Sequence, residues 1–467
     1  MGVDQGTDLT ESRSDVAPIV ADLRRVFATG RTRPAAWRIA QLEGIERLLV
    51  EREDDIVQAL AEDLGRSSLE NWFIDVAPAG AEASYVRKRL RRWMRRSLRG
   101  LPVNQQPALG WVQYEPLGVV LIVGAWNAPV TLVLKPLVAA IAAGNCVVLK
   151  PSELTPATSR LLARIVPEYL DPEAVAVVEG DGTVTQDLLA QGMDHCLFTG
   201  STEIGRKVMA AAAPHLTPVT LELGGKSPVI VTADADLEVT ARRIAWAKLL
   251  NSGQVCLAPD YLLVERSVRD ELVARIVEAV GRFRAEESSP GVRIINERQF
   301  DRLAGYLATT RATVVLGGGF DREGLTVEPT VLLDPEVDEP MMTEEIFGPI
   351  LPVLAVDSLD AAFAFVTSRP KPLAAYLFTR SADARRRFVA EISAGGMVVN
   401  HLVYHYSAQV LPFGGVGASG TGRYNGKWGF ETFSNRKAVL VKPFKPDPRF
   451  VYPPYTDRAV AILRRLF

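Results

Sequence analysis

The spacing of hydrophobic residues changes near residue 117 of this chain. Before that point it is helical: in residues 38–64, apolar side chains recur every three or four positions. Gly65 follows this run and suits the end of a helix. We therefore predict that residues up to about 100 are mainly helical. Residues 105–114 are predicted to form an extended hairpin that leaves the main body.

From residue 117 onward, short apolar runs alternate with helical segments. Residues 118–124 are continuously apolar, which is typical of a strand buried on both faces of a parallel sheet. A helix is expected to follow and to end at Gly144. Including the first run, we predict five strands, at residues 118–124, 146–149, 175–178, 196–198 and 219–223. Strands joined by helices in this way form a doubly wound, Rossmann-like sheet that binds nucleotides.

A second α/β set begins at Val229. Asp236 is placed to cap a helix, and Gly253 ends that helix just before Cys256. Further strands are predicted at residues 261–264, 330–333, 350–355, 374–378 and 396–399. After Gly420, residues 438–441 form a candidate strand that we expect to pair with the early hairpin.

These patterns predict an α/β protein with two Rossmann-like doubly wound domains and a small bridging β-element. Its expected divisions are N-terminal helices of the cofactor-binding domain, a bridging hairpin, a dinucleotide-binding sheet, a catalytic domain, and a return segment with the bridging strand and tail. Their boundaries are residues 1–103, 104–116, 117–223, 224–400 and 401–467.

Composition and charge exclude several classes of protein. The 467 residues are 48% hydrophobic and 23% charged, as in ordinary globular proteins, and the net charge of −2 gives no reason to expect a nucleic-acid partner. Three cysteines and four histidines show neither a disulfide framework nor metal-ligand spacing, so we expect no metal. Polar residues and prolines interrupt the apolar stretch 117–149, and the polar N-terminus lacks a secretory signal. We therefore expect a cytoplasmic protein without a transmembrane span.

The candidate chemistry centres on Cys256 and Glu222. Cys256 ends the segment Asn-Ser-Gly-Gln-Val-Cys on what is predicted to be an exposed turn, and Glu222 precedes two glycines. A thiol and a carboxylate in such loops suggest a sulfur nucleophile with a base that activates water. Cys146 and Cys196 lie inside apolar strands and are expected to be core residues.

Asn127 is the third candidate. It follows the first buried strand, at the edge of the sheet where ligands bind, and its amide is a donor suited to a developing oxyanion. An asparagine that merely serves a turn remains the alternative.

Together these motifs resemble the aldehyde dehydrogenase superfamily, from about residue 29 to residue 443. The resemblance implies an aldehyde dehydrogenase fold, in which Cys256 attacks an aldehyde and Glu222 activates the water that hydrolyses the thioester. It also implies that Asn127 and the backbone N–H of Cys256 stabilise the oxyanion. Two other activities stay open: a coenzyme A-acylating aldehyde dehydrogenase, and a catalytically silent structural member of the fold.

The same resemblance implies a dinucleotide cofactor. Glycines between a strand and a helix at residues 198–205 let the backbone approach a phosphate. The implied cofactor-binding residues are Trp126, Lys150, Glu153, Gly200, Ser201, Thr202, Ile204, Gly205, Glu345 and Phe347. Since Glu153 accepts hydrogen bonds from ribose hydroxyls and repels a 2′-phosphate, we expect NAD as cofactor, with NADP tolerated because Lys150 is nearby.

Within the superfamily, residues 30–34, 216–220, 411–417 and 452–456 resemble the class 3 branch. We accordingly expect a homodimer that acts on a small-molecule substrate, an aldehyde. Residues 85–99 are predicted to be an unusually basic helix, with arginines and lysines on a solvated face or against an acidic partner.

Overall fold

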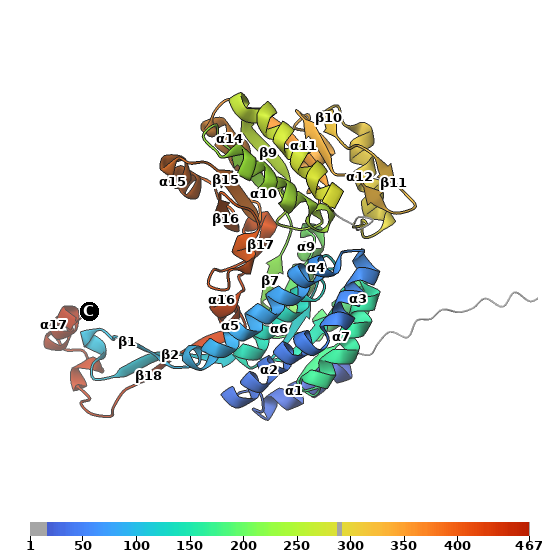
Figure 1. Ribbon diagram of the computed structural model, residues 1–467. Coiled ribbons are helices and arrows are strands. Elements are labelled where there is room, and N and C mark those ends of the chain that lie inside the picture. Colours follow the sequence, from blue (N-terminus) through green and yellow to red (C-terminus); the bar gives the residue numbers. More distant parts are fainter. Residues whose placement is uncertain (1–15, 287–291, 467) are drawn as a thin grey trace, which may run out of the picture.

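The computed structural model describes residues 16–286 and 292–466. The N-terminal stretch expected to lack a signal, and the outermost residues of the divisions 1–103 and 401–467, lie outside this range. Two large sheets with helices on both faces form the main body, and a three-stranded sheet extends from it (Figure 1). The α/β architecture predicted from the hydrophobic pattern is confirmed.

The first sheet has six strands in the order β17-β7-β6-β3-β4-β5. Five of them are parallel and match the predicted strands: β3 (Val119–Val123), β4 (Cys146–Lys150), β5 (Val175–Val177), β6 (His195–Thr199) and β7 (Val219–Glu222). The sixth, β17 (Gly420–Thr421), runs antiparallel to β7 and was not predicted, since two residues leave no periodic signal.

Alternate residues of these strands face two different helical layers. Val120 and Ile122 pack in the core with α2 (Ala35–Glu51), α3 (Glu53–Leu64), α5 (Ala77–Trp93), α6 (Thr131–Ala143) and α7 (Pro156–Tyr169). Val119 and Leu121 face α1 (Val16–Ala28), α8 (Gly182–Leu189) and α9 (Thr202–Ala212). Burial on both faces is the reason why β3 is a continuous apolar run.

The second sheet has seven strands in the order β10-β13-β14-β9-β8-β15-β16. Its strands are β8 (Pro228–Val231), β9 (Tyr261–Glu265), β10 (Thr313–Leu316), β13 (Thr330–Leu333), β14 (Ile350–Val356), β15 (Ala374–Phe378) and β16 (Gly396–Val399). One face packs on α10 (Leu237–Leu249) and α11 (Arg269–Glu286), and the other on α12 (Glu297–Thr309), α14 (Leu359–Thr367) and α15 (Ala382–Glu391). All five strands predicted after residue 260 are confirmed. A small hairpin adds β11 (Phe320–Asp321) and β12 (Thr326–Val327).

Two predictions in the N-terminal part need correction. The run 38–64 is not one helix, because Arg52 (φ −117°) breaks it between α2 and α3, although Gly65 (φ 72°) does end α3. The basic helix 85–99 ends already at Trp93. Its last residues form β1 (Ser97–Arg99), which is antiparallel to β2 (Leu109–Pro116). The hairpin thus starts before residue 105, because its first strand overlaps the arginine-rich run.

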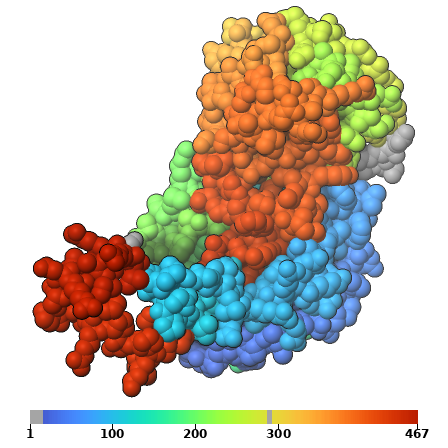
Figure 2. Space-filling view, turned by 90° about the vertical axis from the view of Figure 1, so that its left-hand side faces the viewer, coloured from blue at the N-terminus to red at the C-terminus, as the bar shows by residue number. Residues whose placement is uncertain are grey.

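The hairpin and the C-terminal tail form a projecting arm. Strand β18 (Ser434–Val441) pairs with β2 along its whole length, which confirms the predicted pairing of residues 438–441. The arm continues into α17 (Asp457–Leu466) and stands away from the main body in both views (Figures 1 and 2). Among residues 16–286 and 292–466, no helix has the length and apolar character needed to cross a membrane.

Candidate active site

Four strand ends of the first sheet meet at one edge. Val123 is in register with Lys150 and Phe198, and Thr199 with Glu222. The backbone N–H of Gly124 donates to the carbonyl of Lys150 at 3.0 Å, and that of Gly200 to the carbonyl of Glu222 at 3.0 Å. Since ligands bind at the carboxyl ends of parallel strands, this edge holds Asn127, Lys150, Gly200 and Glu222 in one region.

The loop that carries Cys256 turns sharply after α10. Asn251 (φ 48°), Ser252 (φ 53°) and Gly253 (φ 71°) are all left-handed, which reverses the chain. A side chain at Gly253 would collide with the backbone of Gly348, so glycine is required there. Cys256 lies half-buried at the end of this loop, rather than on the exposed turn predicted.

Asn127 connects this loop to the first sheet. Its side-chain Nδ2 donates to the backbone carbonyl oxygen of Gln254 at 3.1 Å. Its backbone carbonyl oxygen accepts a hydrogen bond from Nδ2 of Asn251, also at 3.1 Å. The Asn127 side chain is buried. An amide carries two N–H donors, and the bond to Gln254 uses one of them. This leaves the second N–H of the amide for another acceptor.

Glu222 is a buried carboxyl close to two cations. Burial raises its pKa well above the usual value, and the charges of Arg423 and Lys135 act in the opposite direction. Neither of its side-chain oxygens has a hydrogen-bond partner among the described residues. A carboxyl with a raised pKa and free oxygens is suited to accept a proton near neutral pH.

Glu345 is the second buried carboxyl of the site. Burial and the charge of Asp260 raise its pKa to about 8, although the Gly225 N–H donates to it. The side chain lies against Gly224, where any Cβ would collide with the Glu345 carboxyl. Both carboxyls therefore lie at the glycine segment after β7. Glu222 is the residue before it, and Glu345 contacts Gly224 within it.

The two carboxyls act on the thiol. The pKa of Cys256 is raised to about 12 by burial first, then by the charges of Glu345 and Glu222. Without a ligand the sulfur is therefore protonated, and attack on a carbonyl requires a base to take this proton. Cys146 and Cys196 are fully buried in strands, as predicted.

Arg302 stabilises the loop that carries Glu345 and Phe347. Arg302 donates Nη1 to the carbonyl of Glu345 at 3.0 Å and Nη2 to that of Ile346 at 2.7 Å. Phe347 has a left-handed backbone (φ 47°), and its ring meets the Trp126 ring edge-on, 5.4 Å between centroids. Trp126, Glu345 and Phe347 are thus brought together beside the Cys256 loop.

The other predicted cofactor residues lie in two places: Gly200, Ser201, Thr202, Ile204 and Gly205 at the start of α9, and Lys150 and Glu153 at the end of β4. The Ser201 hydroxyl accepts the Ile204 N–H at 3.3 Å and caps the helix, and Thr202 Oγ1 donates to the Ala418 carbonyl at 3.2 Å. A Cβ at Gly200 would meet the Phe198 ring at 2.5 Å, and one at Gly205 would meet Leu223 at 2.6 Å. Lys150 and Glu153 form an ion pair of 2.6 Å.

These residues fit a dinucleotide. The N-terminus of α9 offers backbone N–H groups and a positive dipole end to a phosphate, and glycine at position 200 keeps the approach open. The Thr199 hydroxyl at the end of β6 is buried without a hydrogen-bond partner among the described residues. Glu153 carries an acceptor and Lys150 a donor, the two kinds of group that can bond to ribose hydroxyls.

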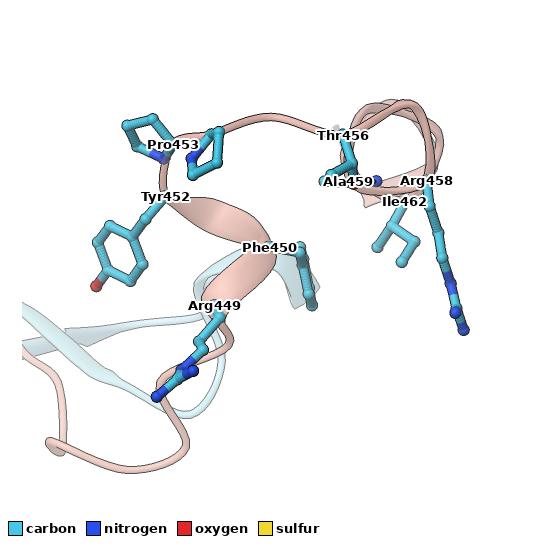
Figure 3. A pocket seen from close by; sticks show the side chains of 9 residues that line it. Arg449, Phe450, Tyr452, Pro453, Thr456, Arg458, Ala459 and Ile462 are labelled. Carbon is cyan, nitrogen blue, oxygen red and sulfur yellow. Dashed lines mark hydrogen bonds between the residues drawn. The ribbon is translucent and has the colours of Figure 1, made fainter.

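Neither a metal cluster nor a second reactive cavity competes with this site in the described part of the chain. No group of three or more His, Cys, Asp or Glu side chains arranged for a metal occurs in the described part of the chain. A hollow of about 570 Å³ lies on the projecting arm, lined only by residues of the tail such as Phe450, Tyr452 and Ile462 (Figure 3). Its lining contains no cysteine and no carboxylate, so the chemistry described above does not take place there.

Sequence reasoning missed several residues of the site. Asn251 and Gln254 lie in the segment that ends at Cys256 but were given no role, and Arg302 left no motif. All three side chains donate to backbone carbonyls. Lys135 did leave a signal, since it is one lysine in an otherwise apolar helix and is fully buried there. Its Nζ lies 3.7 Å from the centre of the Tyr406 ring.

The fold and this site define an oxidoreductase that uses a cysteine nucleophile and a dinucleotide. The chain belongs to the aldehyde dehydrogenase family, whose family model matches residues 7–439. It is 45% identical to aldehyde dehydrogenase family 3 member H1 of Arabidopsis thaliana over 97% of this chain and 95% of that protein. It is 42% identical to the dimeric, NADP-preferring aldehyde dehydrogenase of Canis lupus familiaris over 94% of this chain and 98% of that one.

Solved structures agree with this assignment. The substrate-bound state of Staphylococcus aureus AldH superposes with a TM-score of 0.93 at 38% identity, and covers 97% of this chain and 99% of that one. An indole-3-acetaldehyde dehydrogenase complexed with NAD⁺ has a TM-score of 0.85 at 30% identity, with 91% and 89% covered. The protein is an NAD(P)-dependent aldehyde dehydrogenase that oxidises an aldehyde to a carboxylic acid through a covalent cysteine intermediate.

Proposed function

We propose that Cys256, Asn127 and Glu222 carry out this oxidation. The Cys256 thiol gives its proton to the Glu222 carboxylate, which passes it on to solvent, and the sulfur attacks the aldehyde carbonyl carbon to give a thiohemiacetal. The negative oxygen is stabilised by the free N–H of the Asn127 amide and by the backbone N–H of Cys256. The observation that carries the proposal is the hydrogen bond from Asn127 to Gln254, two residues before the nucleophile.

Bound NAD(P) supplies a hydride acceptor, so that the thiohemiacetal becomes a thioester on Cys256. The Glu222 carboxylate then removes a proton from water, and the resulting hydroxide attacks the thioester carbon. The carbon–sulfur bond breaks, the acid leaves, and the thiol is restored. The raised pKa and unpartnered oxygens of Glu222 support this role.

The first experiment measures aldehyde-dependent formation of reduced cofactor with short, long and aromatic aldehydes. Cys256→Ala should abolish it and leave cofactor binding within about threefold, because the thiol is the only covalent group. Cys196→Ala is the matched control, since that cysteine lies inside β6. Residual activity above a trace in Cys256→Ala contradicts the assignment. A free acid as product, with or without added coenzyme A, excludes the acyl-transferring alternative.

We propose that NAD is preferred over NADP. Glu153 lies just after β4, beside Lys150. There its carboxylate can accept hydrogen bonds from ribose hydroxyls and would repel a 2′-phosphate. One relative is named NADP-preferring. In this chain we expect the repulsion of a 2′-phosphate by Glu153 to outweigh its attraction to Lys150. The ratio of kcat/KM for the two cofactors tests the proposal.

We propose that the chain forms a homodimer through the projecting arm. Several apolar side chains of the arm are exposed, and Phe444 is fully so, while the hollow of the tail lies open beside them. The canine relative is named dimeric. Light scattering on Leu440→Lys, which alters β18, should show a monomer. Val410→Lys, at an exposed apolar residue of the main body, is the control and should remain dimeric.

We also propose a cytoplasmic location, because the reaction requires a reduced Cys256 thiol and a reducing compartment keeps thiols in that form. Fractionation of cells that express the full chain tests it. Recovery of the enzyme in a membrane or secreted fraction contradicts the proposal.

A further inference from the structure

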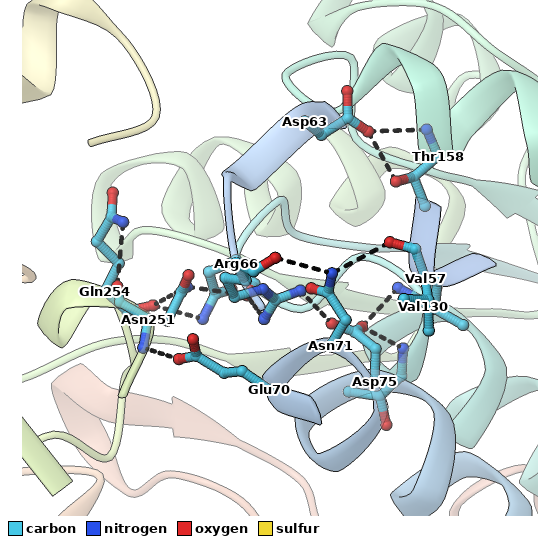
Figure 4. Close-up of polar contacts among 12 residues, drawn as sticks. Val57, Asp63, Arg66, Glu70, Asn71, Asp75, Val130, Thr158, Asn251 and Gln254 are labelled. Carbon is cyan, nitrogen blue, oxygen red and sulfur yellow. Dashed lines mark hydrogen bonds and ion pairs between the residues drawn. The ribbon is translucent and has the colours of Figure 1, made fainter. Parts of the chain in front are cut away.

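A short N-terminal segment contacts both loops of the reaction site. It comprises residues 66–75, with α4 (Ser68–Asn71) and most of the π-helical turn η1 (Trp72–Val76). Three of its side chains, Arg66, Glu70 and Asp75, point toward Asn251 and the start of α6 (Figure 4). We call these three residues the positioning set.

Glu70 contacts the loop of the nucleophile. Its Oε1 accepts the backbone N–H of Asn251 at 2.6 Å, five residues before Cys256. Asn251 and Ser252 are both left-handed, a conformation that non-glycine residues keep only when their surroundings hold it. The carboxylate of Glu70 is one such constraint, and it comes from the helices that pack on the other sheet.

Arg66 and Asp75 contact the loop of the oxyanion donor. Arg66 Nη2 and Asp75 Oδ2 form an ion pair of 2.6 Å, and both side chains are fully buried. Asp75 Oδ1 also accepts the backbone N–H groups of Val130 and Thr131, at 2.9 and 3.0 Å, where α6 starts. Asp75 lies in a π-helical turn, a rare form that is frequent at functional sites.

The contacts of the positioning set converge on the carbonyl oxygen of Asn127. This oxygen accepts Arg66 Nη1 at 3.4 Å and Asn251 Nδ2 at 3.1 Å. A carbonyl oxygen has two lone pairs, so two donors from different directions restrict the orientation of its peptide plane. That orientation sets the direction of the Asn127 side chain, whose Nδ2 bonds to Gln254.

We infer that Arg66, Glu70 and Asp75 are positioning residues that fix the Asn127 amide relative to Cys256. The inference rests on the proposed function of those two residues. None of the three touches the reacting atoms; they hold two loops of different sheets in one hydrogen-bonded arrangement. Their effect therefore falls on transition-state stabilisation rather than on binding.

The test compares Glu70→Ala with Glu70→Gln. Loss of the acceptor in Glu70→Ala should lower kcat about 10- to 100-fold, because a small displacement of an oxyanion donor has effects of this size. The KM values for aldehyde and cofactor should stay within about threefold. Glu70→Gln keeps an oxygen acceptor for the Asn251 N–H and should restore kcat to within about threefold. Glu62→Ala, at an exposed carboxylate on α3, is the control and should match the unaltered enzyme.

A second variant shows whether both contacts act through the same arrangement. Asn251→Gly retains the left-handed backbone without strain but removes the donor to the Asn127 carbonyl. It should lower kcat to a similar extent, and the double variant with Glu70→Ala should lose less than the product of the two effects. If Glu70→Ala does not fold, the kcat of Asn251→Gly alone tests the inference.

Three results would overturn the inference: a normal kcat in Glu70→Ala, an equal loss in Glu70→Gln, or multiplicative losses in the double variant. A loss confined to KM would overturn it as well. If the unaltered enzyme shows no aldehyde-dependent reduction of cofactor, the proposed function fails. An active enzyme with unaffected Glu70 variants contradicts the positioning role alone.

Discussion

Glu345 raises the pKa of the Cys256 thiol more than Glu222 does, although Glu222 is the proposed base. The two carboxyls also differ in what holds them. Glu345 accepts the Gly225 N–H, whereas both oxygens of Glu222 are unpartnered among the described residues. Glu345 is thus a carboxyl held in place beside the sulfur, and Glu222 has oxygens available for water.

The first prediction concerns the charge that Glu345 carries when it is deprotonated. A negative neighbour disfavours the thiolate, so Glu345→Gln should lower the pKa of Cys256 and increase its alkylation by iodoacetamide. The pKa of Glu345 is about 8, so the carboxyl is mostly neutral at pH 7 and charged at pH 9. The difference between variant and unaltered enzyme should therefore grow as the pH rises through 8.

Alkylation rates of the enzyme without cofactor, measured from pH 7 to 10, check this prediction. Glu344→Gln is the control, since that side chain accepts the Tyr306 hydroxyl instead of facing the sulfur. Equal rates for Glu345→Gln and the unaltered enzyme at pH 9 would show that the Glu345 charge does not act on Cys256.

The second prediction separates the two half-reactions. Glu222→Gln keeps the shape of the side chain but removes the base, so hydride transfer should survive, with solvent taking the thiol proton directly, while thioester hydrolysis slows about 10²- to 10⁴-fold. Stopped-flow absorbance should then show one burst of reduced cofactor per site, followed by a slow phase. A steady-state rate equal to that of the unaltered enzyme would remove Glu222 from the mechanism.

The third prediction concerns the cation beside Glu222. Arg423 lowers the pKa of this carboxyl, so Arg423→Gln should raise it. The base works only when deprotonated, and a higher pKa leaves less of it active at low pH. The ascending limb of the kcat profile should therefore move to higher pH, provided that hydrolysis is the slow step.

Arg423→Lys is the matched control, because it keeps the positive charge near Glu222. It should leave the ascending limb close to its original position, even though the bonds from Arg423 to the carbonyls of Gly415 and Gly422 change. A shift to lower pH in Arg423→Gln, or equal shifts in both variants, would show that the charge of Arg423 does not control Glu222.

Much of the fold could be predicted because burial leaves a periodic trace. Strands β3 and β4 are buried on both faces and are therefore uninterrupted apolar runs. Strand β1 was missed because Ser97–Arg99 lies on the projecting arm, where arginine is as acceptable in a strand as in a helix. The two residues of β17 are placed only by their pairing with Glu222 and Leu221.

The residues of the site likewise divide into those that a sequence pattern indicates and those that only the fold brings together. Cys256, Glu222 and Asn127 could be predicted as site residues because each lies at or soon after the end of a predicted strand or helix. Arg66, Glu70 and Asp75 lie near residue 70, and their partners lie near residues 127 and 251. No spacing along the chain shows contacts that arise only when distant loops meet in three dimensions.

The last prediction concerns the choice of cofactor. Lys150 is almost fully buried and its ammonium group is paired with Glu153, which is more exposed. In Glu153→Ala the repulsion of a 2′-phosphate disappears and Lys150 loses its counter-charge, so both changes favour NADP. Loss of the hydrogen bonds to the ribose hydroxyls should at the same time weaken NAD. We expect the ratio of kcat/KM for NADP over NAD to rise about tenfold or more, which corresponds to one charge-assisted hydrogen bond of about 1.5 kcal/mol. Glu203→Ala, at an exposed carboxylate on α9 that pairs with Lys207, is the control and should leave the ratio unchanged. A ratio that stays constant in Glu153→Ala would show that this carboxylate does not face the adenosine ribose.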